Sequence, residues 1–184
     1  MNLYDSRAVI DNIVGLSDVK RFHGRSTLHT QSVADHSCRV AQIAFFLALE
    51  FYKGDIVKAN YVSTLALFHD FPEAVLKCDI SSPIKAQNGI GIKTKALEKS
   101  AIMKIFDDKY LQDLMLEVSA PDDFNILKLA DTLDFGLYVR DEISLGNSKM
   151  YPLIDGFQEE LWKYSQNYTS LHFAETCVCK ILGV

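Results

Sequence analysis

The chain has no long hydrophobic run, no excess of basic residues and no Cys-x-x-Cys pair among its four cysteines, and each absence excludes a class of protein. No apolar run approaches the roughly 20 residues that a membrane-spanning helix needs, so we expect no membrane partner. A formal net charge of −5 argues against a nucleic-acid polymer as partner, because such a surface is basic. The cysteine spacing argues against a zinc ribbon. The composition therefore favours a globular protein whose ligand is a small molecule.

The length of 184 residues favours one domain over residues 1–184, with a full hydrophobic core. The first residues, Met1–Asp5, contain no basic region followed by an apolar stretch, so they do not resemble a secretory signal. We therefore expect a cytoplasmic protein with reduced thiols.

Helical periodicity dominates the pattern, and no stretch alternates strictly between apolar and polar residues. The sequence predicts an all-α fold, a compact helical bundle. Asp55 is expected to cap a helix, and Pro72 is expected to bend or restart one. The segment 77–93, rich in serine and glycine, is expected to be a long loop. The predicted helices cover residues 6–19, 33–52, 55–70, 94–106 and 122–142, and two more follow near the C-terminus.

Polar residues interrupt the apolar faces of three predicted helices. His36, His69 and Asp131 occupy core positions, and Asp70 follows His69 directly. Taken singly, each is more easily a hydrogen-bonded core residue, and Asp131 could pair with an arginine such as Arg39. Taken together, one divalent cation would satisfy all four, since buried imidazole and carboxylate groups are costly unless paired or metal-bound. Imidazole nitrogen with carboxylate oxygen suits cobalt, manganese, zinc, nickel or iron.

A hydrolytic site needs more than a metal, and the neighbouring residues offer candidates. A bound divalent ion makes hydroxide available near neutral pH, so a metal site in a chain of this kind suggests hydrolysis. Glu73 follows Asp70 by three residues and is a candidate acid or base, with a solvated surface glutamate as the alternative. Cations near loops could hold a phosphate or could be ordinary surface residues: Arg21, Arg25, Lys85 and Lys93.

Three short strings resemble the signature of the HD-domain phosphohydrolase superfamily. They are Asp35–Ala41 around the first histidine, Leu67–Ala74 around the His-Asp pair, and Lys128–Asp134 around the last aspartate. The resemblance covers roughly residues 20–140, with the C-terminal helices expected to pack on this core. It implies an all-α HD-type bundle in which His36, His69, Asp70 and Asp131 hold a divalent metal.

Within the superfamily the chain is most similar to the small 5′-deoxynucleotidases and to phage enzymes that hydrolyse deoxyadenosine triphosphate. The string Asp79–Lys85 resembles the loop that follows the second motif in those relatives, and Arg21-Phe22 stands in place of their Arg-Trp pair. The resemblance implies that Glu73 handles a proton and that Asp79 orients the nucleotide or leaving group. It also implies that Lys85 and Arg21 meet phosphate. In those relatives the tryptophan crowds the sugar and disfavours a 2′-hydroxyl, and Phe22 replaces it here.

The resulting expectation is a metal-dependent hydrolase that removes the 5′-phosphate, or the whole triphosphate, from a 2′-deoxynucleotide, with adenine as the first base to test. Hydrolysis of a cyclic nucleotide or an alarmone is one alternative, and a non-catalytic nucleotide-binding or assembly module is another. We also expect a homo-oligomer. Apolar C-terminal residues could form its interface or could be core: Leu161, Trp162, Leu171 and Phe173.

Overall fold

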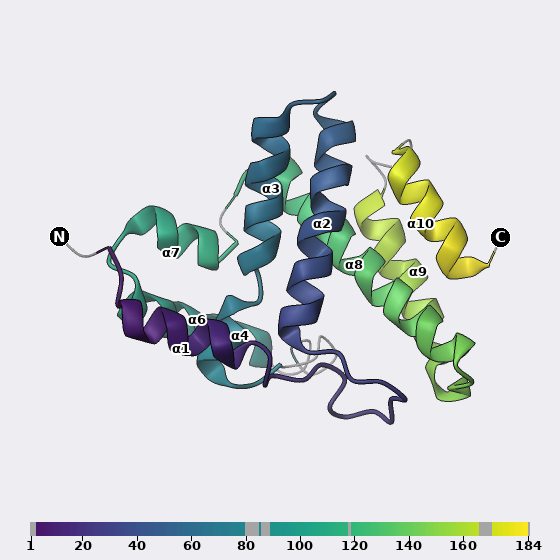
Figure 1. Ribbon diagram of the computed structural model, residues 1–184, viewed down its shortest axis with the longest axis horizontal. Coiled ribbons are helices and arrows are strands. Elements are labelled where there is room, and N and C mark those ends of the chain that lie inside the picture. Colours follow the sequence, from purple (N-terminus) through teal and green to yellow (C-terminus); the bar gives the residue numbers. More distant parts are fainter. Residues whose placement is uncertain (1–2, 80–84, 86–88, 118, 166–170, 184) are drawn as a thin grey trace. The chain divides into compact units, whose positions relative to one another are not determined.

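The computed structural model describes residues 3–79, 85, 89–117, 119–165 and 171–183, and in these ranges the chain is built from helices (Figure 1). The described residues contain no β-strand, only two isolated bridges that pair Tyr4 with Phe106 and Lys20 with Ser32. The predicted all-α fold is therefore confirmed. No helix in the described ranges is both long and apolar enough to span a bilayer.

The described residues group into two compact units. The first comprises Met1–Arg25, Thr30–Ser37 and Phe68–Ser119. In it, the short helix α4 (Phe71–Leu76) packs against α1 (Ser6–Gly15) and α6 (Ile90–Ile105), and α7 (Lys109–Met115) contacts α6. Asp5 caps α1 by accepting from the backbone N–H groups of Arg7 and Ala8, and Asp108 caps α7 through Leu111.

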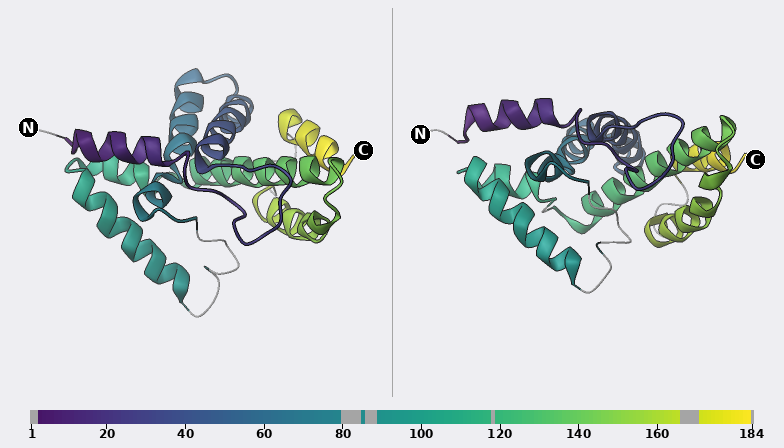
Figure 2. Two further views of the ribbon diagram at one scale, coloured as in Figure 1. Left: turned by 60° about the horizontal axis from the view of Figure 1, so that its bottom comes forward. Right: turned by 90° about the horizontal axis from the view of Figure 1, so that it is seen from below.

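The second unit comprises Ser26–His29, Cys38–Leu67 and Ala120–Val184. Its centre is the long helix α8 (Pro121–Ser144), against which α9 (Pro152–Ser165) and α10 (His172–Leu182) pack (Figure 2). The 3-10 turn η1 (Ser148–Met150) joins α8 to α9. Helices α2 (Val33–Phe51) and α3 (Ile56–Phe68) are linked where Ser63 Oγ donates to the carbonyl of Ala41 at 2.9 Å. Fully buried core residues include Leu47, Leu65, Ile126, Leu127, Leu129 and Leu133.

Several helix boundaries follow the sequence pattern. Asp55 caps α3 through the backbone N–H groups of Val57 and Lys58, as predicted. The chain restarts as α4 at Phe71, with Pro72 in the first turn, where it needs no backbone donor. Both C-terminal helices are present, and α8 is slightly longer than predicted because Pro121 is its first residue rather than the residue before it.

Other boundaries differ from the prediction. The first helix ends at Gly15 instead of continuing to Val19. Helix α6 begins at Ile90, not at Thr94, because Gly89 adopts the left-handed conformation (φ 73°) that starts it. The predicted loop is therefore shorter at this end, and its residues 80–84 and 86–88 lie outside the described ranges. The short helix α7 was not predicted. The expectation of a single domain stays a prediction.

Candidate metal and phosphate site

His36 lies on the first turn of α2, which begins with a reciprocal cap. The backbone N–H of Asp35 donates to Ser32 Oγ at 3.1 Å, and the backbone N–H of Ser32 donates to Asp35 Oδ2 at 3.2 Å. This arrangement satisfies two helix-end donors at once and fixes where the helix starts. The backbone N–H of His36 then donates to the carbonyl of Ser32 at 3.1 Å. The cap therefore sets the direction of the His36 side chain, which is fully buried.

His69 and Asp70 lie in the break between α3 and α4. The His69 ring is buried, and its Nε2 lies 3.2 Å from Oδ2 of Asp70. The same oxygen lies 3.4 Å from Nε2 of His36, and the two imidazole rings are 5.2 Å apart between centroids. Three of the four predicted ligands therefore face one another, as expected for groups that share a common ion.

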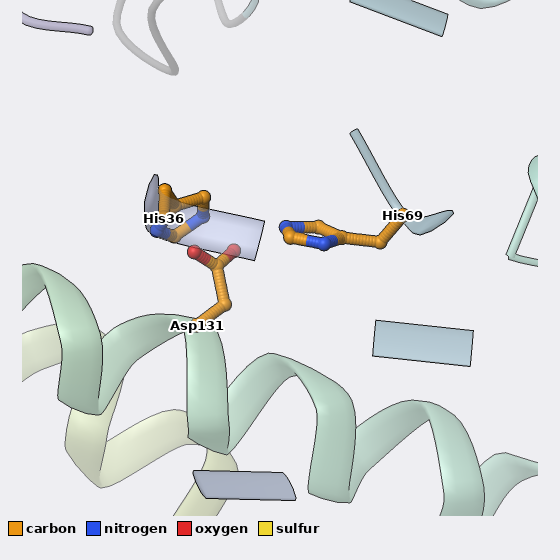
Figure 3. Close-up of side chains that lie close together, drawn as sticks. All are labelled: His36, His69 and Asp131. Carbon is orange, nitrogen blue, oxygen red and sulfur yellow. The ribbon is translucent and has the colours of Figure 1, made fainter. Parts of the chain in front are cut away.

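Asp131 comes from α8, where Lys128 lies one turn before it with Nζ 4.0 Å from Oδ2. One ligand atom from each of His36, His69 and Asp131 can be chosen so that the three lie within 4.8 Å of one another. Figure 3 shows the carboxylate and the two rings gathered at one place. Arg39, the alternative partner considered for Asp131, has its Nε 2.7 Å from Asp134 Oδ1.

This donor set fits a divalent transition metal. Ligand distances near 2.1 Å place two donors of one ion at most about 4 Å apart, so small side-chain shifts would bring these atoms to bonding distance. Two imidazole nitrogens with carboxylate oxygens favour zinc, cobalt, manganese, nickel or iron over calcium or magnesium.

Glu73 lies on α4, and its side chain is buried, which rules out the alternative of a solvated surface glutamate. Burial, together with the neighbouring charges of Asp70 and Asp79, raises the pKa of this carboxyl from 4.5 to about 10. Lys85 opposes this shift, and its Nζ lies 3.5 Å from Glu73 Oε1. Glu73 therefore binds a proton at neutral pH in the metal-free chain.

Asp79, Lys85 and Arg21 lie near enough to one another for their charges to interact. Burial raises the pKa of Asp79, which Arg21 lowers in part. Burial opposes the charge on Lys85, but the acidic groups around it, Glu73 foremost, raise its pKa overall. Lys85 therefore stays protonated and can meet a phosphate. The structure thus brings the predicted Asp79, Lys85 and Arg21 into one mixed-charge cluster with Glu73.

Phe22 follows Arg21 in a backbone conformation that few non-glycine residues adopt. Its φ is 57°, in the left-handed region. The guanidinium carbon of Arg21 lies 5.6 Å from the centroid of the Phe22 ring, a cation–π distance. The pair is therefore held together at the start of the loop that leads to α2.

Sequence reasoning missed several acids. Glu98 on α6 has a pKa raised by burial and lowered in part by Lys85, so it belongs to the same cluster. Its helical spacing from the buried Thr94 and Ile102 was the available signal. Three further acids are buried along α8 and were not singled out: Asp123, Asp134 and Glu142.

A family model and the relatives found by sequence comparison point to the same family. A family model described as 5′-deoxynucleotidase YfbR-like matches residues 9–181. A 5′-deoxynucleotidase of Citrobacter koseri is 31% identical over 143 residues, which is 71% of this chain and 70% of the relative. The 5′-deoxynucleotidase YfbR of Salmonella arizonae has the same identity and coverage.

Solved structures share the fold at lower identity. An HD-domain phosphohydrolase of Listeria innocua superposes with a TM-score of 0.66 at 20% identity, covering 96% of this chain and 86% of that one. The HD phosphohydrolase DatZ of cyanophage S-2L, bound to dA and one catalytic Zn²⁺, gives a TM-score of 0.67 at 14% identity, covering 100% of this chain and 97% of that one. These likenesses establish the HD-domain fold.

Proposed function

Because the chain belongs to the YfbR-like 5′-deoxynucleotidase family, an HD-type group of phosphohydrolases, we propose that it hydrolyses the 5′-phosphate ester of 2′-deoxynucleoside monophosphates, with dAMP as the favoured substrate. The observation that carries the proposal is the approach of His36 and His69 to one oxygen of Asp70, next to the buried Glu73. The dA bound by DatZ supports adenine as the base to test first.

The metal is proposed to be held by His36, His69, Asp70 and Asp131. When bound, a divalent ion would lower the pKa of a water ligand and polarise a phosphoryl oxygen. Lys85 and Arg21 would neutralise the remaining charge of the phosphate. They would thereby orient its ester bond toward the ligand cluster.

Glu73 is proposed to manage the proton. A carboxyl with a pKa of about 10 carries a proton at neutral pH and can donate it to the leaving 5′-oxygen. Beside a dication its pKa would fall toward neutrality, where a carboxyl both holds and releases a proton readily. Asp79 would accept a hydrogen bond from the sugar or the leaving group and so orient it. Phe22 would lie against the sugar.

Hydrolysis of the whole triphosphate is the second candidate, because the cations near the loop extend beyond Lys85 to Lys93 and Lys95. We keep the single domain, the cytoplasmic location and the homo-oligomer as predictions. Of the four apolar residues considered for an interface, Trp162 is 71% exposed and Leu171 is buried.

The test is a hydrolysis screen that identifies each product. Purified protein is loaded with cobalt, manganese or zinc and offered dAMP, AMP, dATP, the other deoxynucleoside monophosphates, a cyclic nucleotide and ppGpp. We expect deoxyadenosine and orthophosphate from dAMP. Release of tripolyphosphate from dATP, with dAMP left intact, would establish the second candidate instead.

Two variants give the screen its controls. Asp70→Asn removes a proposed ligand and should abolish nearly all turnover, whereas Asp155→Asn changes an exposed acid on α9 and should not. Hydrolysis of ppGpp or a cyclic nucleotide alone would contradict the proposed substrate class. A metal-loaded protein that binds but hydrolyses no nucleotide would indicate a non-catalytic module.

A further inference from the structure

Glu142, on the last turns of α8, has a fully buried side chain and takes no part in the proposed chemistry. Its Oε2 accepts from the backbone N–H of Leu28 at 2.8 Å, and its Oε1 accepts from the backbone N–H of His29 at 2.9 Å. Asn147 adds a third donor, with Nδ2 2.6 Å from Oε2. Burial alone would raise the pKa of Glu142, but these hydrogen bonds lower it. The buried carboxylate is therefore ionised, and both of its oxygens accept hydrogen bonds.

The segment 26–29, which has no helix or strand of its own, makes further contacts with α8 and with Asn147, which follows that helix. His29 Nδ1 lies 2.7 Å from Glu142 Oε1, and the hydroxyl of Tyr138 donates to the carbonyl of His29 at 2.8 Å. The His29 and Tyr138 rings are 4.7 Å apart. Asn147 also donates to the carbonyl of Ser26 at 2.9 Å. A loop held by this many contacts has little freedom to move on its own.

The same loop begins at the proposed substrate residues. The loop runs from Arg21 to the α2 cap. Its two ends are joined by a hydrogen bond in which the backbone N–H of Arg21 donates to the carbonyl of Gln31 at 2.9 Å. The backbone N–H of Arg25 donates to the carbonyl of Phe22 at 2.8 Å, which closes a turn that begins at the left-handed Phe22. A residue in that conformation stays there only when the surrounding structure fixes it.

We propose that Glu142 is a positioning residue for substrate binding: by fixing residues 26–29 it holds the loop in the form that keeps Phe22 strained and Arg21 ready for the phosphate. This inference rests on the proposed function. Residues fixed before the substrate arrives lose less conformational freedom on binding, so the affinity for substrate is higher. If Phe22 lies against the sugar, as proposed above, a ring held in place would then discriminate between deoxyribose and ribose, because a fixed ring cannot withdraw from a 2′-hydroxyl.

The test uses Glu142→Gln, which keeps the shape of the side chain but turns one acceptor into an NH2 group facing backbone N–H donors. The matched control is Glu50→Gln, since Glu50 also accepts from a backbone N–H, that of Phe173 at 3.2 Å, but at the start of α10. Both variants are compared with the unmodified chain for metal content, amide hydrogen exchange, kcat and KM with dAMP and AMP.

For Glu142→Gln we expect faster amide hydrogen exchange across residues 21–32 and an unchanged metal content. The KM for dAMP should rise about tenfold while kcat changes far less, and the preference for dAMP over AMP should be smaller. Glu50→Gln should leave all four at the level of the unmodified chain. If Glu142→Gln does not fold, Tyr138→Phe removes only the bond to the His29 carbonyl and should shift KM in the same direction by a smaller factor.

The outcomes separate this inference from the proposed function. If the unmodified, metal-loaded chain hydrolyses no deoxynucleotide, the proposed function fails. If it hydrolyses dAMP but the loop variants keep the original KM and the original dAMP preference, the positioning role of Glu142 is wrong, even where exchange shows a looser loop. A loss confined to kcat, or to metal content, would overturn it equally.

Discussion

Replacing Glu73 with glutamine should stabilise the metal-free protein, and more so at high pH. The carboxyl keeps its proton in the folded chain up to a pKa of about 10, whereas in the unfolded chain it loses the proton above about 4.5. Folding therefore takes up a proton between these values, and the free energy of unfolding falls as the pH rises. The slope is about 1.4 kcal/mol for each pH unit for one such group.

The magnitude follows from that slope over a practical range. Between pH 5.5 and 8.0 the unmodified chain should lose about 3 kcal/mol of stability that Glu73→Gln does not lose. The side chain is only 8% exposed, so solvent screens little of this effect. Titrating groups that do not contact Glu73 contribute equally to both proteins and cancel in the difference.

The assay is urea unfolding in the presence of a chelator at the two pH values. As a control, Glu159→Gln changes an exposed glutamate on α9 and should give the same difference from the unmodified chain at both values. A stability gain for Glu73→Gln that does not grow with pH would show instead that Glu73 is ionised in the folded protein.

Two further predictions concern the second unit. Gly136→Ala places a Cβ 2.5 Å from a ring carbon of the fully buried Phe157, so the free energy of unfolding should fall by about 1–3 kcal/mol. The urea midpoint measures this loss, and an unchanged midpoint would show that the ring can move. Arg39→Met removes the cation that lies 2.7 Å from the buried Asp134 carboxylate and should destabilise the protein by up to about 3 kcal/mol. Adding Asp134→Asn should recover part of that loss, whereas additive costs would show that the pair is not coupled.

Local sequence patterns predicted most of the helices because their signals are local. Asp55 precedes its helix and Pro72 interrupts one, and both act within a single turn. The short helix α7 was not predicted, because seven residues carry too little hydrophobic periodicity to distinguish a helix from a loop. The start of α6 was misplaced because Gly89, a residue typical of loops, serves as its first cap.

The ligand candidates could be predicted because each polar residue interrupts an apolar face. His36 and His69 occupy positions where a core needs hydrophobic residues, and the structure buries both. Glu142 could not be found in this way, because a charged residue near the end of a long helix is typical of a solvated face. Its partners, Leu28 and His29, lie more than a hundred residues away along the chain, and no local sequence pattern predicts such a contact.

Locating the bound metal tests directly whether His36, His69, Asp70 and Asp131 form one site. Crystals grown with cobalt or manganese should give one anomalous peak, measured at the absorption edge of the metal, about 2.0–2.3 Å from nitrogens of His36 and His69 and from oxygens of Asp70 and Asp131. A map with no peak at these atoms under saturating metal, each side chain being engaged with its protein neighbours instead, would contradict the account.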